Sequence, residues 1–174
     1  DFSNPIILEF PPENANNDIM FFNNVDEAVV YGVELEFRKS LGFLSEKLAN
    51  FSLMTNLALI HSNVDMTEEE CASVQDNNPE KGCSRPFFGQ SPYLINAAIN
   101  YDNQEMGLNA NLAFNVFGER LVIQGPSLVP DIFEQPFPQL DFVASKKINE
   151  NFGLRVNIMN ILNQDYWTSM EFRE

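Results

Sequence analysis

The chain has 174 residues and a formal net charge of −15, from 10 Lys and Arg against 25 Asp and Glu. This balance excludes a nucleic-acid partner, because phosphate binding needs clustered Lys and Arg. It either keeps loops solvated or suits a surface that handles cations or cationic ligands. Sixteen Phe residues favour strands, and no apolar run approaches the roughly 18 residues of a transmembrane helix.

The first predicted strand covers residues 1–10. Pro11 and Pro12 stop it, and residues 13–17 form a polar loop. Residues 18–38 are the next extended run, whose second half alternates with a period of two and so separates two faces of a strand. One face has Val29, Tyr31, Val33, Leu35 and Phe37, and the other has Ala28, Val30, Gly32, Glu34, Glu36 and Arg38.

This run resembles a strand of TonB-dependent outer-membrane receptors. Residues 23–37, NNVDEAVVYGVELEF, hold Asn24, Ala28, Gly32 and Glu34 at the family's spacing. A strand glycine such as Gly32 also marks a bend or a close backbone approach. Glu34 and Glu36 could form a carboxylate pair, but successive same-face residues of a strand more often line a wet surface.

Residues 39–49 are predicted to be a short turn region, and residues 50–64 a strand in which Phe51, Leu53, Thr55, Leu57 and Leu59 share a face. His61 lies near the end of this strand. We do not assign it to a metal site, because no second ligand is near it in sequence.

Residues 65–88 form the longest predicted loop, which holds both cysteines of the chain. Cys71 and Cys83 are separated by eleven residues, which suits a local disulfide in an oxidising compartment. A thiolate metal pair is the alternative, but two ligands do not close a site. The acidic residues of the loop either solvate it or could hold a hard cation such as calcium: Asp65, Glu68, Glu69, Glu70, Asp76 and Glu80.

Residues 85–101, RPFFGQSPYLINAAINY, have the most specific resemblance, to the returning strand of Bacteroidetes-type receptors of the same family. Pro92 stands at the strand start, where its missing N–H does least harm. A tight turn at 102–105 leads to a strand at 106–118, which makes a hairpin. Ser91 precedes a proline at the start of a strand and is interpreted as structural.

Residues 119–135 are predicted to be a second long loop, because Gly125, Pro126 and Pro130 break the pattern. The strand at 137–148 includes PQLDFVASKKI, which resembles another strand of the family. After a tight turn at 149–151, the strand at 152–162 alternates Leu154, Val156 and Ile158 with polar residues. Its tail, NILNQDY at 160–166, resembles the end of the family's penultimate strand.

Together these elements predict an all-β fold: an antiparallel up-and-down transmembrane β-barrel segment, with about seven strands of a larger, roughly 22-stranded barrel. The predicted strands run about 11 to 20 residues, beyond the 5 to 6 that are usual in sandwiches. Short connections (40–49, 102–105, 149–151) alternate with long ones (11–17, 65–88, 119–135). We expect residues 1–174 to be part of the barrel domain, without the plug and the last strand. Seven strands would leave edges unpaired.

The resemblance implies a receptor in the outer membrane of a Gram-negative bacterium. It would contact outer-membrane lipid, take up a scarce ligand, most often an iron–siderophore chelate and sometimes cobalamin or a glycan, and use energy passed on by the TonB complex. Loops 65–88 and 119–135 would touch the ligand, with Arg85, Phe87, Phe88 and Phe133 as candidate contacts. The sequence has no phosphate-cradling glycine loop, nucleophile elbow, CxxC or HExxH. We therefore expect no catalytic residue, no cofactor and no metal site.

Two alternatives remain open. A non-gated barrel channel or a barrel-type adhesin shares every strand feature of this sequence. A soluble β-sandwich binding module from a secreted protein would instead be stable in water without detergent. Its outward faces would be polar.

Overall fold

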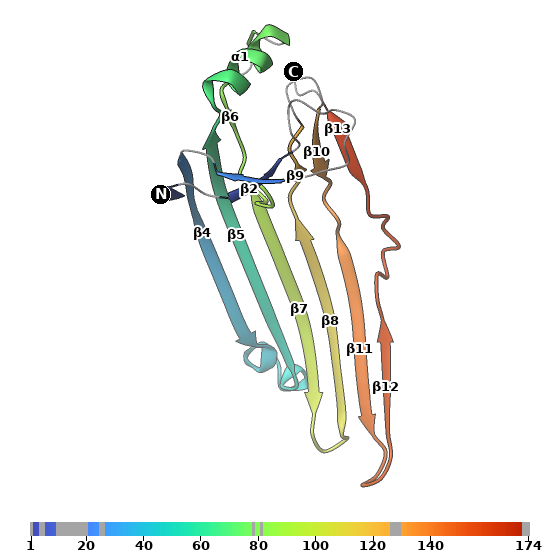
Figure 1. The fold of residues 1–174 in the computed structure, drawn as a ribbon. Coiled ribbons are helices and arrows are strands. Elements are labelled where there is room, and N and C mark those ends of the chain that lie inside the picture. The colour runs from blue at the N-terminus through green and yellow to red at the C-terminus, as the bar shows by residue number, and fades with distance from the viewer. Residues whose placement is uncertain are drawn as a thin grey trace.

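A long antiparallel sheet dominates the molecule. The computed structural model describes residues 2–3, 6–9, 21–24, 27–77, 79–80, 82–125 and 130–171. The sheet has eight strands in the order β1-β4-β5-β7-β8-β11-β12, and β6 pairs with the end of β5 (Figure 1). Their bounds are β1 (Phe2–Ser3), β4 (Glu27–Ser40), β5 (Phe51–Asp65), β6 (Ser84–Arg85), β7 (Tyr93–Asn103), β8 (Leu108–Phe117), β11 (Gln139–Lys147) and β12 (Gly153–Ile158).

The two ends of this sheet differ. At the turn end, connections are short: the 3-10 helices η1 (Leu41–Phe43) and η2 (Glu46–Leu48), and turns at 104–107 and 148–152. At the α1 end lie helix α1 (Glu68–Asn77) and a three-stranded sheet, β13-β10-β9 (Figure 1). The predicted alternation of short and long connections is therefore confirmed wherever the connection is described. The predicted loop 11–17 lies outside the described residues.

The prediction of an all-β antiparallel fold is confirmed. Strands β5, β7, β8, β11 and β12 fall on the predicted strands to within a few residues. The described part of the sheet is open, since β1 pairs only with β4 and β12 pairs only with β11.

The predicted strands at 1–10 and 18–38 each divide between two sheets. Strand β1 pairs with β4, whereas β2 (Ile6–Glu9) pairs with β3 (Phe21–Asn24) in a separate two-stranded sheet. Pro5 stands between β1 and β2 in the sequence and has no N–H to continue a ladder. Neither run is therefore a single strand.

The two long predicted loops have more structure than expected. Residues 119–135 contain strands β9 (Arg120–Ile123) and β10 (Asp131–Glu134), and β10 also pairs with β13 (Thr168–Glu171). Gly125 and Pro130 mark the connection between two strands and do not mark the whole segment as irregular. Residues 65–88 contain α1, whose first turn holds three Glu residues, which the helix dipole favours at that end.

The strand predicted at 152–162 ends at Ile158, because the NILNQDY segment that follows forms a turn held by side-chain hydrogen bonds. Asn160 and Asn163 have positive φ angles of 51° and 49°, a conformation that Asn tolerates better than most residues. The Asp141 carboxylate accepts the Asn160 N–H at 2.8 Å, and the Asn160 side chain accepts the Gln164 N–H at 3.1 Å. The ladder with β11 ends at Ile158, the Ile161 N–H still donates to the Leu140 carbonyl at 2.8 Å, and the chain then leads to β13, which pairs with β10.

Gly32 lies where the backbone of β5 comes close to β4. A Cβ at this position would lie 2.4 Å from the Leu59 carbonyl oxygen and 3.1 Å from the Ile60 Cα, both backbone atoms that cannot move aside cheaply. Of the two interpretations of this glycine, close backbone approach is the one that the structure supports.

We expect Gly32→Ala to lower the free energy of unfolding by about 1–3 kcal/mol, because the added methyl forces β4 away from β5. Gly82→Ala is the matched control, since a Cβ there meets nothing within 4 Å. Its effect should stay within about 0.5 kcal/mol. Urea unfolding of both variants checks this, and equal midpoints would contradict the close-approach interpretation.

Candidate functional site

One face of the long sheet is an exposed apolar surface that crosses all of its long strands. Directly opposite residues of an antiparallel pair lie on the same face. The register pairs Leu35 with Leu57, Leu57 with Ile95, and Ile95 with Val116. The same face continues through Leu112 and Phe142 to Ile158. On β4 its members are between 39% and 62% exposed: Val29, Tyr31, Val33, Leu35 and Phe37.

The opposite face is more polar, although Leu94 and Phe117 also lie on it, and its Asn side chains form an amide ladder that runs from Glu34 of β4 across β5, β7 and β8. The Asn56 amide donates to Glu34 at 2.5 Å, Asn96 donates to Asn56 at 3.5 Å, and Asn115 donates to Asn96 at 2.5 Å. Nearer the turn end, Asn111 donates to Asn100 at 2.5 Å. Each donor thus points toward the previous strand, and the chain of hydrogen bonds ends on a carboxylate.

The carboxylates of β4 are engaged within this polar face. Glu34 accepts from Asn56, and Glu36 forms an exposed ion pair with Arg38. The pair Glu34 and Glu36 is therefore part of a hydrogen-bonded polar surface, which is the wet-face interpretation of these residues. A shallow hollow of about 290 Å³ lies beside them, lined in part by Arg38, Asn96 and Ala113.

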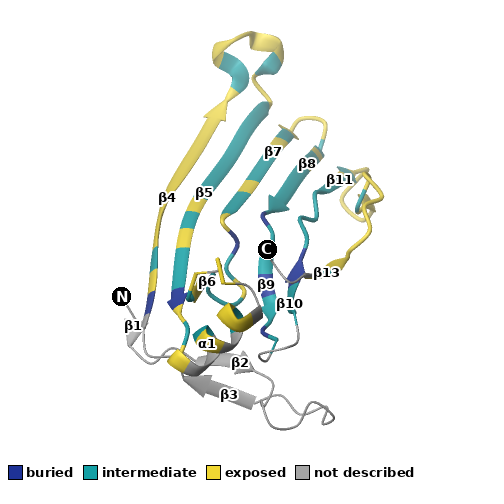
Figure 2. Ribbon diagram, turned by 90° about the horizontal axis from the view of Figure 1, so that it is seen from above, coloured by how far each residue is buried: buried dark blue, intermediate teal, exposed yellow. Residues whose placement is uncertain are grey.

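Buried residues gather at the α1 end of the sheet, where β5, β6, β9 and β10 meet (Figure 2). A cavity of about 380 Å³ lies there, between the end of β5 and residues of β6, β10 and the segment after β6. Arg85 and Phe133, predicted to contact ligand, both line it, together with Ser62, Gln90 and Glu119.

The other two predicted contacts do not line this cavity. Phe87 packs against the buried pair Ala28 and Val64, and its N–H donates to the Ser62 hydroxyl at 3.1 Å. Phe88 is half-buried in the turn that follows. The structure therefore brings together Arg85 and Phe133, 48 residues apart in the sequence, and gives Phe87 a packing role.

Charged groups in this region are paired. The Arg85 side chain is 8% exposed and lies 4.0 Å from an Asp131 oxygen, and Asp131 also accepts the Gly125 N–H at 3.0 Å. Arg120 binds Glu134 at 2.6 Å and lies over the Phe117 ring at 4.4 Å. Asp131, Glu119 and Glu134 have no sequence signal as site residues, because nothing local shows that β10 and the residue before β9 come close to β6 and β5.

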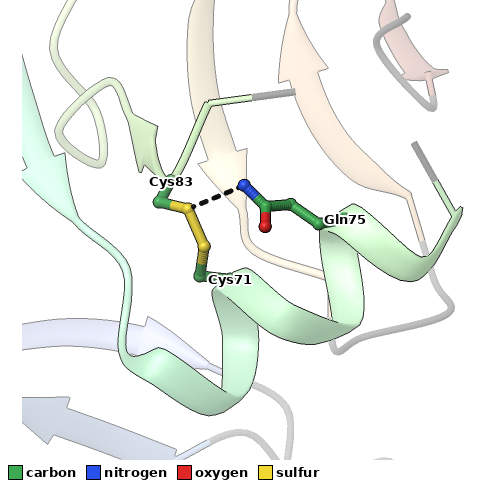
Figure 3. The surroundings of a disulfide bond; sticks show 3 residues. All are labelled: Cys71, Gln75 and Cys83. Carbon is green, nitrogen blue, oxygen red and sulfur yellow. Dashed lines mark hydrogen bonds between the residues drawn. A yellow bond between two sulfur atoms is a disulfide. The ribbon is translucent and has the colours of Figure 1, made fainter. Parts of the chain in front are cut away.

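A disulfide joins Cys71 of α1 to Cys83, just before β6 (Figure 3). The Gln75 amide donates to the Cys83 sulfur at 3.3 Å, and the Met66 N–H donates to the Cys83 carbonyl at 2.9 Å. The described residues contain no group of three or more His, Cys, Asp and Glu side chains that could hold a metal ion. His61 lies beside Tyr31, with ring centroids 4.9 Å apart.

Comparison with known proteins identified no matching family, no matching curated protein and no matching solved structure. In the part of the chain that the structure describes, no helix is both long enough and apolar enough to span a bilayer.

We expect Arg85→Met to lower the free energy of unfolding by about 3 kcal/mol. This is the lower end for breaking a buried ion pair, because the Gly125 N–H still supports Asp131. Arg38→Met removes an ion pair whose side chains are 66% and 50% exposed, so solvent screening limits its cost to about 0–1 kcal/mol. Urea unfolding of the two variants measures the difference, and an Arg85→Met cost no larger than that of Arg38→Met would show that the Arg85 pair is not structural.

Proposed function

We propose that this chain forms barrel wall and outer loops of a TonB-dependent receptor in the outer membrane of a Gram-negative bacterium. The observation that supports this most is the exposed apolar face, continuous from β4 to β12 and opposite a face of hydrogen-bonded amides. Water does not stabilise such a face, whereas the hydrocarbon of a bilayer does. The polar face would then line a water-filled interior.

The strand dimensions fit this assignment. Strands β4, β5, β7 and β8 have 14, 15, 11 and 10 residues, and a tilted strand needs about 9–11 residues to cross a bilayer. Short turns gather at one end and longer segments at the other, as outer-membrane barrels place periplasmic turns and outer loops. In this arrangement the α1 end faces outward and the turn end faces the periplasm.

The proposed activity is uptake of a scarce ligand, most often an iron–siderophore chelate, with energy passed on by the TonB complex through a part of the receptor outside this chain. The cavity at the α1 end has polar lining side chains that a ligand could contact, among them Arg85, Gln90 and Ser62. The family resemblance of residues 23–37, 85–101 and 160–166 supports the receptor over a non-gated channel or adhesin. This family resemblance implies no covalent chemistry.

Leu35→Arg and Glu36→Arg test which face meets lipid, because they place the same side chain on neighbouring residues of opposite faces. Leu35 is 61% exposed. In a bilayer, Leu35→Arg should cost about 2–4 kcal/mol if the residue lies near the midplane, and Glu36→Arg less than about 1 kcal/mol. Unfolding of full-length protein reconstituted in lipid gives both values. In a soluble module, arginine at exposed Leu35 would be nearly neutral, and that result would support the sandwich.

Localisation and TonB dependence test the receptor itself. We expect the full-length protein in the outer-membrane fraction, with a gel mobility that changes on boiling, as a closed barrel's does. Ferric-siderophore uptake under iron limitation should fall to background when TonB is deleted. Uptake that persists without TonB would favour a non-gated channel, whereas a soluble protein with no mobility change would overturn the membrane assignment.

A further inference from the structure

The disulfide lies next to a wall of the α1-end cavity. Cys83 directly precedes β6, a strand of only two residues, Ser84 and Arg85, which pair with Asp65 and Val64 at the end of β5. Arg85 lines the cavity and faces Asp131 of β10. Strand β6, which contains Arg85, therefore begins one residue after a disulfide-bonded cysteine.

Helix α1 has few other means of staying folded. It has ten residues, and isolated helices shorter than about 12–15 residues are marginal in water. Of its side chains that are described, Cys71 and Val74 are half-buried, and Glu68, Ala72, Gln75 and Asp76 are exposed. Among the described contacts of the helix, the Cys71–Cys83 bond is the covalent attachment to the segment that forms β6.

Noncovalent contacts next to β6 add to its two-residue pairing. The Met66 N–H donates to the Cys83 carbonyl, the Phe87 N–H donates to Ser62, and Arg85 lies 4.0 Å from Asp131. The first is next to the disulfide, and the last connects β6 to the separate sheet of β10. Movement of Cys83 would thus shift Arg85 in the cavity wall and, through Arg85, would affect Asp131 of β10.

We infer that the Cys71–Cys83 disulfide is a thiol-sensitive latch that holds Arg85 in the wall of the cavity. This inference does not depend on the proposed transport function. Both cysteines are half-buried at the α1 end, so a small dithiol can reach the bond. The dithiol's thiolate attacks one sulfur, the S–S bond breaks, and two electrons pass to the chain. Cys71 and Cys83 become thiols, and the dithiol closes to a cyclic disulfide.

Reduction of the disulfide should loosen the part of the cavity wall that contains Arg85 and leave the long sheet intact. Without the bond, α1 loses its covalent attachment, and β6 is held only by its two-residue pairing and by the noncovalent contacts of its neighbouring residues. Arg85 then withdraws from Asp131, and the Gly125 N–H that Asp131 accepts is held less firmly. The backbone hydrogen bond from Gly118 to Tyr93, 2.8 Å long, lies outside the latch and should not change.

Hydrogen exchange with mass spectrometry on the full-length protein tests the latch, with dithiothreitol as the reductant. This chain has only two cysteines, so the Cys71→Ser, Cys83→Ser double variant is the matched form that cannot re-form the bond. We expect exchange at Met66, Phe87 and Gly125 to rise about 10- to 100-fold in both the reduced protein and the double variant. Exchange at Gly118 should stay the same.

The variant Arg85→Met distinguishes a disulfide that holds the cavity wall from one that only attaches α1. In this variant, reduction should still raise exchange at Met66 but should no longer change exchange at Gly125, because the link to Asp131 is already lost. If reduction of the unmodified protein raises exchange at Met66 alone, the disulfide is only a local tie and the inference is wrong. The outcome is independent of membrane localisation and uptake, so a failure here leaves the proposed function standing.

Discussion

In-register antiparallel pairing of the long strands is the constraint on which the rest of the structure depends. In the middle of the strands from β4 to β12, directly opposite residues on one face are apolar, as in the pairs Leu35 and Leu57, Ile99 and Leu112, and Phe142 and Ile158. A slip of one residue on any strand would place its apolar side chains among the amides of the neighbours. The segregation of the two faces is therefore a collective property of all the strands. Gly32 permits it where a Cβ on β4 would meet the backbone of β5.

The sheet has almost no core of its own. Among the described residues, buried apolar side chains are few and lie at the α1 end: Ala28 and Val64 in the long sheet, and Leu121 and Phe133 in the sheet of β9 and β10, are at most 3% exposed. Elsewhere, backbone hydrogen bonds and the amide ladder satisfy polar groups, while the apolar side chains of β4 stay exposed. At the α1 end, a disulfide and the Arg85 and Arg120 ion pairs provide the attachment that a hydrophobic core would otherwise provide. The long strands are therefore held together as one sheet by their backbone pairing. The cavity at the α1 end is instead formed by short segments that the disulfide and the two ion pairs attach.

Much of the fold could be predicted from the sequence, because a period of two is a local signal that does not depend on distant residues. The strands β5, β7, β8 and β11, the short turns between them and the pairing of Cys71 with Cys83 all follow from patterns within one segment. The candidate site was less predictable. Arg85 and Phe133 line one cavity, but Phe87 packs on Ala28 and Val64, and Asp131 and Glu119 were missed because their partners are far away in the sequence. The hairpin of β9 and β10 was missed because its strands have only four residues each, too short for periodicity to stand out.

The sequence by itself determined which side chains share a face, where the long strands turn, and that the chain is an all-β antiparallel protein, since these follow from alternation and turn chemistry alone. Only the tertiary structure decided which strands are neighbours at the α1 end, because β9, β10 and β13 find each other through pairing between distant segments. It also decided how NILNQDY ends β12, since the Asn160 turn needs the Asp141 carboxylate of the neighbouring strand. Pairing between distant segments has no local sequence signal, because the partner strand lies far away in the sequence.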